Sequence, residues 1–130
     1  MSATMPHVLI VEANDLVASE LSVELERRGI TLIQRADCLC DALEAMSHGL
    51  PDIAIVGLRL RDGHTGGRLA KALAICGVQV CVFSDQREPA EALMGISHTF
   101  ISKPAPASIV ASVVHDQANA AFQRSAAVCH

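Results

Sequence analysis

The sequence predicts an α/β fold in which five parallel strands alternate with five helices around one sheet. Short runs rich in Val and Ile recur along the chain, and the segments between them space their apolar residues as one face of a helix does. Strands that alternate with helices in this way are joined by right-handed crossovers. Such a pattern predicts a parallel sheet that helices cover on both faces.

Five runs are predicted as strands because they are short, apolar and rich in β-branched residues. They are residues 8–12 (VLIVE), 30–35 (ITLIQR), 52–57 (DIAIVG), 78–84 (VQVCVFS) and 99–102 (TFIS).

The first two helices have recognisable starts and stops. Asn14 can cap the first, which is expected to end at Gly29. Asp37 is predicted to cap the second, and Pro51 follows its end. Four apolar residues of the second helix are spaced to face the core: Leu39, Leu43, Met46 and Leu50.

The remaining helices are less sharply defined. A third is expected over about residues 67–76 and a weak fourth around 89–94. A fifth follows Lys103 and Pro104 and carries two neighbouring apolar stripes, one of them beginning at Ile109 and the other at Val110. We therefore expect a single domain over residues 1–122 and a short frayed tail over 123–130.

Composition excludes several classes of protein. With 130 residues, 51% of them hydrophobic, the chain can bury a core without a metal or disulfide. No run approaches the ~20 apolar residues of a membrane helix, and the start lacks the pattern of a secretory signal. The net charge is −4 with scattered basic residues, which argues against nucleic-acid binding. The five cysteines form no C-x-x-C pair, so we expect a cytoplasmic protein with structural thiols.

Polar residues follow four of the predicted strands. In parallel sheets, ligands bind beyond the carboxyl ends of the strands. The residues expected there are Glu12, Ala13 and Asn14, then Gly57 to Arg59, then Ser84 and Asp85, and finally Lys103.

Four segments at these strand ends carry a resemblance to a known family. They read VLIVEAND, PDIAIVGLRLRDG, VCVFSD and TFISKP. In this order and spacing, from about His7 to Asn119, the chain resembles the receiver domain of bacterial two-component response regulators. The resemblance implies a flavodoxin-like (βα)5 three-layer sandwich with strand order 2-1-3-4-5. It also implies a site where an aspartate accepts a phosphoryl group from a histidine kinase with Mg²⁺ bound.

The chain departs from that pattern at its acidic positions. Of two acids after the first strand it keeps Glu12 and has Ala13 for the other, and Gly57 stands where the phosphoacceptor aspartate belongs. Ser84 stands at the position of the hydroxyl that bonds the phosphoryl group, and Lys103 with Pro104 at the family's Lys-Pro pair. Without a carboxylate at position 57 the nucleophile is missing. One carboxylate offers Mg²⁺ too little, so no cofactor, no metal and no enzymatic activity are expected.

Two cations are candidates to neutralise Glu12. An isolated buried charge is costly, so Glu12 can pair with Lys103. Alternatively, Arg59 lies on the same side of its strand as Gly57 and could place its guanidinium in the vacated metal position.

Two other acids are candidates for a displaced phosphoacceptor. Asp62 precedes Gly63 and is interpreted as a turn former. Asp85 follows Ser84 and is interpreted as a helix cap.

The sequence favours a stand-alone, phosphorylation-independent protein-interaction module in two-component or phosphorelay signalling. Its partner would be a histidine kinase, another response regulator, an output protein or a second copy of the chain. The expected surface is formed by the fourth helix, the fifth strand and the fifth helix, including Arg87, Met94, His98 and the switch aromatic Phe100. One alternative is a receiver phosphorylated on Asp62 or Asp85. The other is a small-molecule-binding α/β domain that uses the space left by Gly57 and Ala13.

Overall fold

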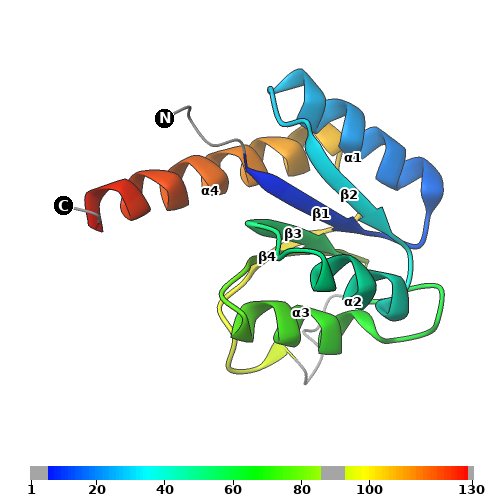
Figure 1. The fold of residues 1–130 in the computed structure, drawn as a ribbon. Coiled ribbons are helices and arrows are strands. Elements are labelled where there is room, and N and C mark those ends of the chain that lie inside the picture. Colours follow the sequence, from blue (N-terminus) through cyan, green and yellow to red (C-terminus); the bar gives the residue numbers. More distant parts are fainter. Residues whose placement is uncertain (1–5, 86–92, 129–130) are drawn as a thin grey trace.

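The protein forms a five-stranded sheet with helices on both faces (Figure 1). This is a computed structural model that describes residues 6–85 and 93–128, with side chains described as far as residue 120. The strands are β1 (His7–Val11), β2 (Leu32–Ala36), β3 (Ile53–Val56), β4 (Gln79–Ser84) and β5 (Thr99–Ser102). The helices are α1 (Asp15–Arg27), α2 (Leu39–Ser47), α3 (Gly66–Ile75) and α4 (Ala107–Val128).

All neighbouring strands are parallel, and their order is β2-β1-β3-β4-β5. The predicted fold class is therefore confirmed. The central strands are in register, with Val11 beside Val56 and Val56 beside Val82. Because parallel strands end at one edge, the residues that follow β1 and β3 are brought side by side.

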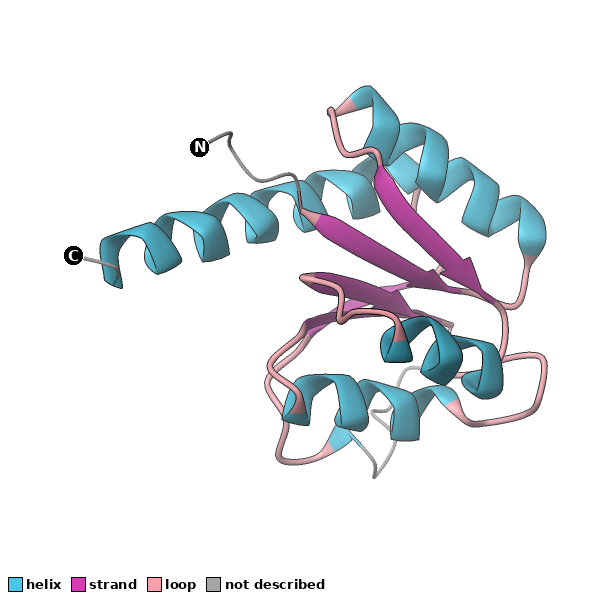
Figure 2. Ribbon diagram, viewed as in Figure 1, coloured by secondary structure: helices cyan, strands magenta, loops and turns pink. Residues whose placement is uncertain are grey.

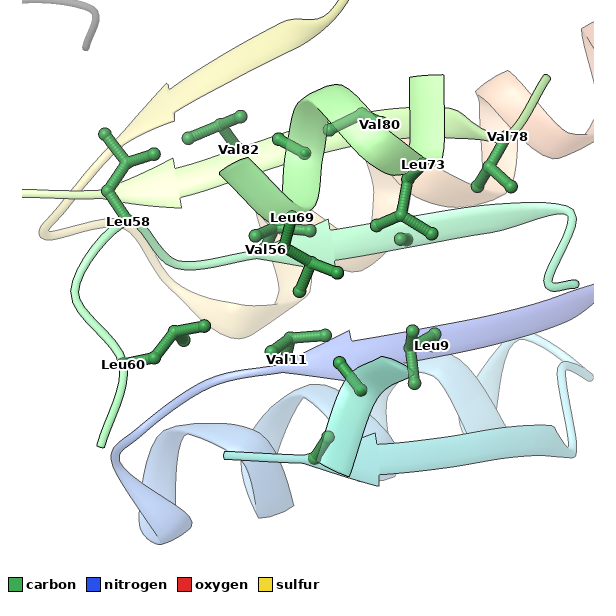
Figure 3. Close-up of a cluster of buried hydrophobic side chains, with 14 of the residues drawn as sticks. Leu9, Val11, Val56, Leu58, Leu60, Leu69, Leu73, Val78, Val80 and Val82 are labelled. Carbon is green, nitrogen blue, oxygen red and sulfur yellow. The ribbon is translucent and has the colours of Figure 1, made fainter. Parts of the chain in front are cut away.

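Alternate residues of each strand enter two separate cores. Leu9 and Val11 face the core beneath α2 and α3, whereas Val8 and Ile10 face the core beneath α1 and α4, as the pleat of a strand requires. Figure 2 shows the sheet between the two helical layers. Figure 3 shows the first of these cores, where side chains of β1, β3, β4 and α3 meet.

The first helix begins and ends where the sequence predicts. The Asn14 side-chain oxygen accepts hydrogen bonds from the amides of Leu16 (3.0 Å) and Val17 (3.2 Å), which are otherwise unpaired donors of the first turn. Past its end, Gly29 has a φ of 85°, a left-handed conformation that favours glycine.

The cap predicted for the second helix is wrong by one residue. Cys38, not Asp37, occupies the cap position, and its sulfur accepts from the Asp41 amide at 3.5 Å. Asp37 instead forms an ion pair with Arg61. A short-range pattern favoured Asp37 because carboxylates cap well, but the partner of this carboxylate lies in a distant loop.

The predicted inward stripe of α2 is only half correct. Leu39 and Met46 pack against the core, whereas Leu43 is 45% exposed and Leu50, beyond the helix end, is 48% exposed. The helix is short, and the small Ala42 takes the fully buried position. The inward face therefore turns away from Leu43.

The last helix buries one of its two predicted stripes. Val110 and Val114 are fully buried, whereas Ile109 is 53% exposed. Helix α4 continues to Val128, past residue 123 where the sequence suggests a tail, and Figure 1 shows its second half extending beyond the sheet. The helix predicted around 89–94 lies largely outside the described residues.

Within residues 6–85 and 93–128, no helix combines the length and the apolarity that crossing a membrane requires.

Candidate functional site

The centre of the site is an ion pair between Glu12 and Lys103. Glu12 directly follows β1 and is only 5% exposed. Its two carboxylate oxygens lie 3.1 Å and 3.2 Å from the Lys103 ammonium nitrogen, and one of them also accepts the Asn14 amide at 3.0 Å. The Lys103 ammonium further lies 5.2 Å from the centroid of the Phe83 ring, a favourable cation–π position. A nearly buried carboxylate is thus neutralised by a tethered cation.

This pairing spans most of the sheet edge. Strands β3 and β4 lie between β1 and β5, so the side chains of Glu12 and Lys103 meet across the end of β3. The Lys103 amide donates to the Ser84 carbonyl at 2.8 Å, and the Lys103–Pro104 peptide bond is cis.

Gly57 lies at the end of β3, directly beside Glu12. It is buried, and its amide donates to the Val11 carbonyl at 2.9 Å. A Cβ placed on Gly57 would lie 3.4 Å from Glu12 Oε1 and 3.7 Å from the carbonyl oxygens of Phe83 and Val11. Its φ is outside the left-handed range, so neither backbone conformation nor space requires glycine here. A side chain could occupy the position, and it would point toward Glu12.

The other residues predicted for the site lie at its border. Ser84 ends β4 and is buried, whereas Ala13 and Pro104 are exposed. Arg59 is exposed too, so the guanidinium pairing considered for Glu12 is not the observed arrangement. Glu12 is paired with Lys103 instead, whose ammonium contacts the carboxylate.

Asp62 makes contacts that its sequence context does not reveal. Its carboxylate accepts the Thr65 hydroxyl at 2.7 Å and the amide of Leu39, at the start of α2, at 3.1 Å. These hydrogen bonds, that from Thr65 foremost, hold the pKa of Asp62 below its usual value. Gly63, with a φ of 112°, closes the local turn by exchanging backbone hydrogen bonds with Leu60. Asp62 is thus a turn residue that also binds the amino end of a distant helix.

The remaining candidates lie on or near the β5 edge. Asp85 is exposed after β4. Met94 is 70% exposed, and Phe100 is partly buried against the core. His98 is partly buried with its ring nitrogen Nδ1 at 3.1 Å from the Ile96 carbonyl. Arg87 lies outside the described residues.

A hollow of about 180 Å³ lies on the opposite side of Glu12 from Gly57, toward β2. It is lined by residues of α1, β2 and α2 and of the loops that follow β1 and β2: Glu12, Ala13, Asp15, Ala18, Arg35, Ala36, Asp37 and Asp41. The Arg35 guanidinium is paired with Asp15 at 2.6 Å. The hollow is smaller than the ~300 Å³ lower bound of typical ligand pockets, and Gly57 does not line it. The space left by Gly57 is therefore not this cavity.

Comparison with known proteins identifies the fold. No family model and no curated protein matches the sequence. Solved structures do match: a CheY-like response regulator receiver domain protein from Methanospirillum hungatei has a TM-score of 0.80 and 14% identity over 94% of this chain and 99% of that one. The N-terminal domain of a response regulator/sensory box/GGDEF protein from Carboxydothermus hydrogenoformans has a TM-score of 0.76 and 23% identity over 95% and 99%. A LuxR-family two-component response regulator from Aurantimonas has a TM-score of 0.73 and 17% identity over 90% and 87%. This chain has the fold of these receiver domains.

Proposed function

We propose that this chain, having the receiver fold, acts in two-component signalling as a protein-interaction module that works without being phosphorylated. Its partner would be a histidine kinase, another response regulator, an output protein or a second copy of the chain, and its compartment the cytoplasm. The observation that carries the proposal is Gly57, which supplies no carboxylate at the end of β3, beside a Glu12 carboxylate that Lys103 already neutralises. In this function the chain catalyses no reaction.

The chemistry of the site supports this. An acyl phosphate forms when a carboxylate oxygen attacks phosphorus, and the backbone at position 57 supplies no such nucleophile. Mg²⁺ needs several oxygen ligands in octahedral geometry, and the Lys103 ammonium competes for both oxygens of Glu12. We propose that the receiver magnesium site is lost.

The displaced acids are poor substitutes. The Asp62 carboxylate is engaged by Thr65 and by the amide of Leu39, so attack on phosphorus would require it to leave both donors. Asp85 is exposed to water, whereas the Glu12 carboxylate at the centre of the site is almost fully buried.

The proposed partner surface includes the β5 edge. Met94 is a large apolar side chain left 70% exposed, and an exposed, adaptable Met is suited to protein contacts. His98 and Phe100 lie nearby in sequence, both partly buried, and Arg87 is proposed to contribute from outside the described residues.

Intact-mass spectrometry after incubation with acetyl phosphate and Mg²⁺ tests the absence of phosphorylation. The wild-type protein should gain no phosphoryl group, while a conventional receiver domain treated in parallel should gain one. A wild-type adduct that disappears in Asp62→Asn or Asp85→Asn would replace the proposal with phosphorylation of a displaced acid.

Affinity capture from native cytosol tests the interaction role. A specific partner should bind equally before and after acetyl phosphate treatment and should be lost with Met94→Lys. Leu43→Lys, which changes an exposed apolar residue on α2, is the matched control and should retain the partner. A partner that binds only after the treatment would contradict phosphorylation independence.

A further inference from the structure

The segment that leaves β3 beside Gly57 is fixed at its base. It begins with Leu58 and Leu60, which are almost fully buried in the core beneath α2 and α3 (Figure 3). Where it rejoins the fold, the Gly66 amide donates to the Leu58 carbonyl at 3.0 Å. A Cβ on Gly66 would lie only 1.9 Å from the Gly57 carbonyl oxygen, so the two backbones are in direct contact.

The exposed tip of the same segment is fastened to the start of α2. The Arg61 amide donates to the Asp37 carbonyl at 2.8 Å, and the Arg61 guanidinium lies 3.3 Å from the Asp37 carboxylate. Next to it, the Asp62 carboxylate accepts the Leu39 amide. We call these four residues, Asp37, Leu39, Arg61 and Asp62, the clasp.

The clasp joins the loop to the start of α2 through two side-chain contacts of different kinds, an ion pair and a hydrogen bond from a backbone amide to a carboxylate. Arg61 reaches from the loop to an acid that precedes α2, and Asp62 reaches from the loop to the Leu39 amide, a first-turn donor without a partner inside the helix. A carboxylate at this end of a helix is favoured both by unpaired amides and by the helix dipole. Asp37, Arg61 and Asp62 are all at least partly exposed as residues, although the Asp37 oxygen that faces Arg61 is itself buried.

We propose that the clasp is a conformational lock that holds the loop after Gly57, and with it the border of the Glu12 pocket, in a single arrangement. A signal shifts an equilibrium between two states only through its differential interaction with them. Because the clasp already holds the loop in one arrangement, the loop presents the same surface to a partner whether or not a signal arrives. This consequence deepens the proposed function and rests on it, whereas the lock itself does not depend on phosphate.

Hydrogen exchange of the full-length protein, followed by mass spectrometry in buffer without acetyl phosphate, tests the lock. In Asp62→Ala, peptides covering residues 58–65 and 39–41 should exchange about fivefold faster, because the Leu39 amide and the loop lose the carboxylate that joins them. Arg61→Ala should accelerate the same two segments. Asp62→Asn keeps an acceptor oxygen and should show a smaller rise, and Asp116→Asn, an exposed acid on α4, should leave both segments unchanged.

Two results would overturn the lock. One is exchange in both segments indistinguishable from wild type in Asp62→Ala and Arg61→Ala. The other is acceleration spread evenly over β1 and β3, which would mean general destabilisation only. Since no phosphate is present, either result leaves the acetyl phosphate experiment to decide the proposed function separately.

Discussion

The Lys103 ammonium lies 3.1 Å and 3.2 Å from the two carboxylate oxygens of Glu12, although β3 and β4 separate the strands that carry these residues. Gly57, which follows β3 between these strands, adds no side chain beside Glu12. The nearly buried Glu12 carboxylate is thus neutralised by a cation of the same chain.

Removing the cation should destabilise the protein. Lys103→Met leaves Glu12 buried without a partner charge, so we expect the free energy of unfolding in denaturant to fall by about 2–4 kcal/mol. Glu12→Gln combined with Lys103→Met should be more stable than Lys103→Met alone, because the orphaned charge is removed. Arg59→Met, at an exposed cation nearby, should change stability little. Equal midpoints for Lys103→Met and wild type would show that the pair is energetically unimportant.

Alanine should destabilise the protein much more at Gly66, at the start of α3, than at Gly57, which follows β3. At Gly66 the added Cβ meets backbone atoms at 1.9 Å and 2.7 Å, so Gly66→Ala should cost more than about 2 kcal/mol of unfolding free energy. At Gly57 the nearest atom is 3.4 Å away and belongs to a side chain, so Gly57→Ala should cost less than about 1 kcal/mol. Similar thermal midpoints for the two variants would refute this reading of the local packing.

Asp62 should contribute to stability only at moderate and high pH. The Thr65 hydroxyl and the Leu39 amide lower its pKa in the folded state, whereas the unfolded value is about 3.9. The contribution is therefore present above about pH 4 and is lost as the pH falls through the lowered folded pKa.

Acid unfolding curves measure this effect. The stability difference between wild type and Asp62→Ala should shrink below about pH 4, and Thr65→Val should weaken the same pH dependence because it removes the leading cause of the shift. A difference that stays constant down to about pH 2 would exclude the hydrogen-bonded carboxylate as its source.

Cys81 should resist alkylation in the folded protein. Burial in the core raises the pKa of its thiol to about 12, and the reactive form is the thiolate. At pH 8, iodoacetamide should label the exposed Cys40 and Cys76, while Cys81 should react only after unfolding. Peptide mapping that finds Cys81 labelled as fast as Cys40 would contradict its burial.

Local signals in the sequence predicted the fold well and the contacts of the site only in part. Asn14 and Gly29 act within a few residues of their own helix, so the bounds of α1 followed from them. Leu43 was misplaced because spacing alone does not reveal which face of a short helix is buried, and here the small Ala42 takes that position.

The contacts between site residues join distant parts of the chain, so local sequence patterns do not predict them. Asp62 and Leu39 are 23 residues apart, and Glu12 and Lys103 are 91 apart. For Glu12, position on the sheet edge narrowed the choice of partner to Lys103 or Arg59, and only the structure shows that Lys103 is paired while Arg59 is exposed.

The most direct test of the central claim restores the acids. In Ala13→Asp combined with Gly57→Asp, the Cβ added at position 57 would lie 3.4 Å from Glu12 Oε1, an ordinary contact, and a second acid stands at the exposed position 13. Intact-mass spectrometry after acetyl phosphate treatment should find one Mg²⁺-dependent phosphoryl group on this variant and none on the wild type. A folded variant that gains no phosphoryl group, or a wild-type protein that gains one, would contradict the account.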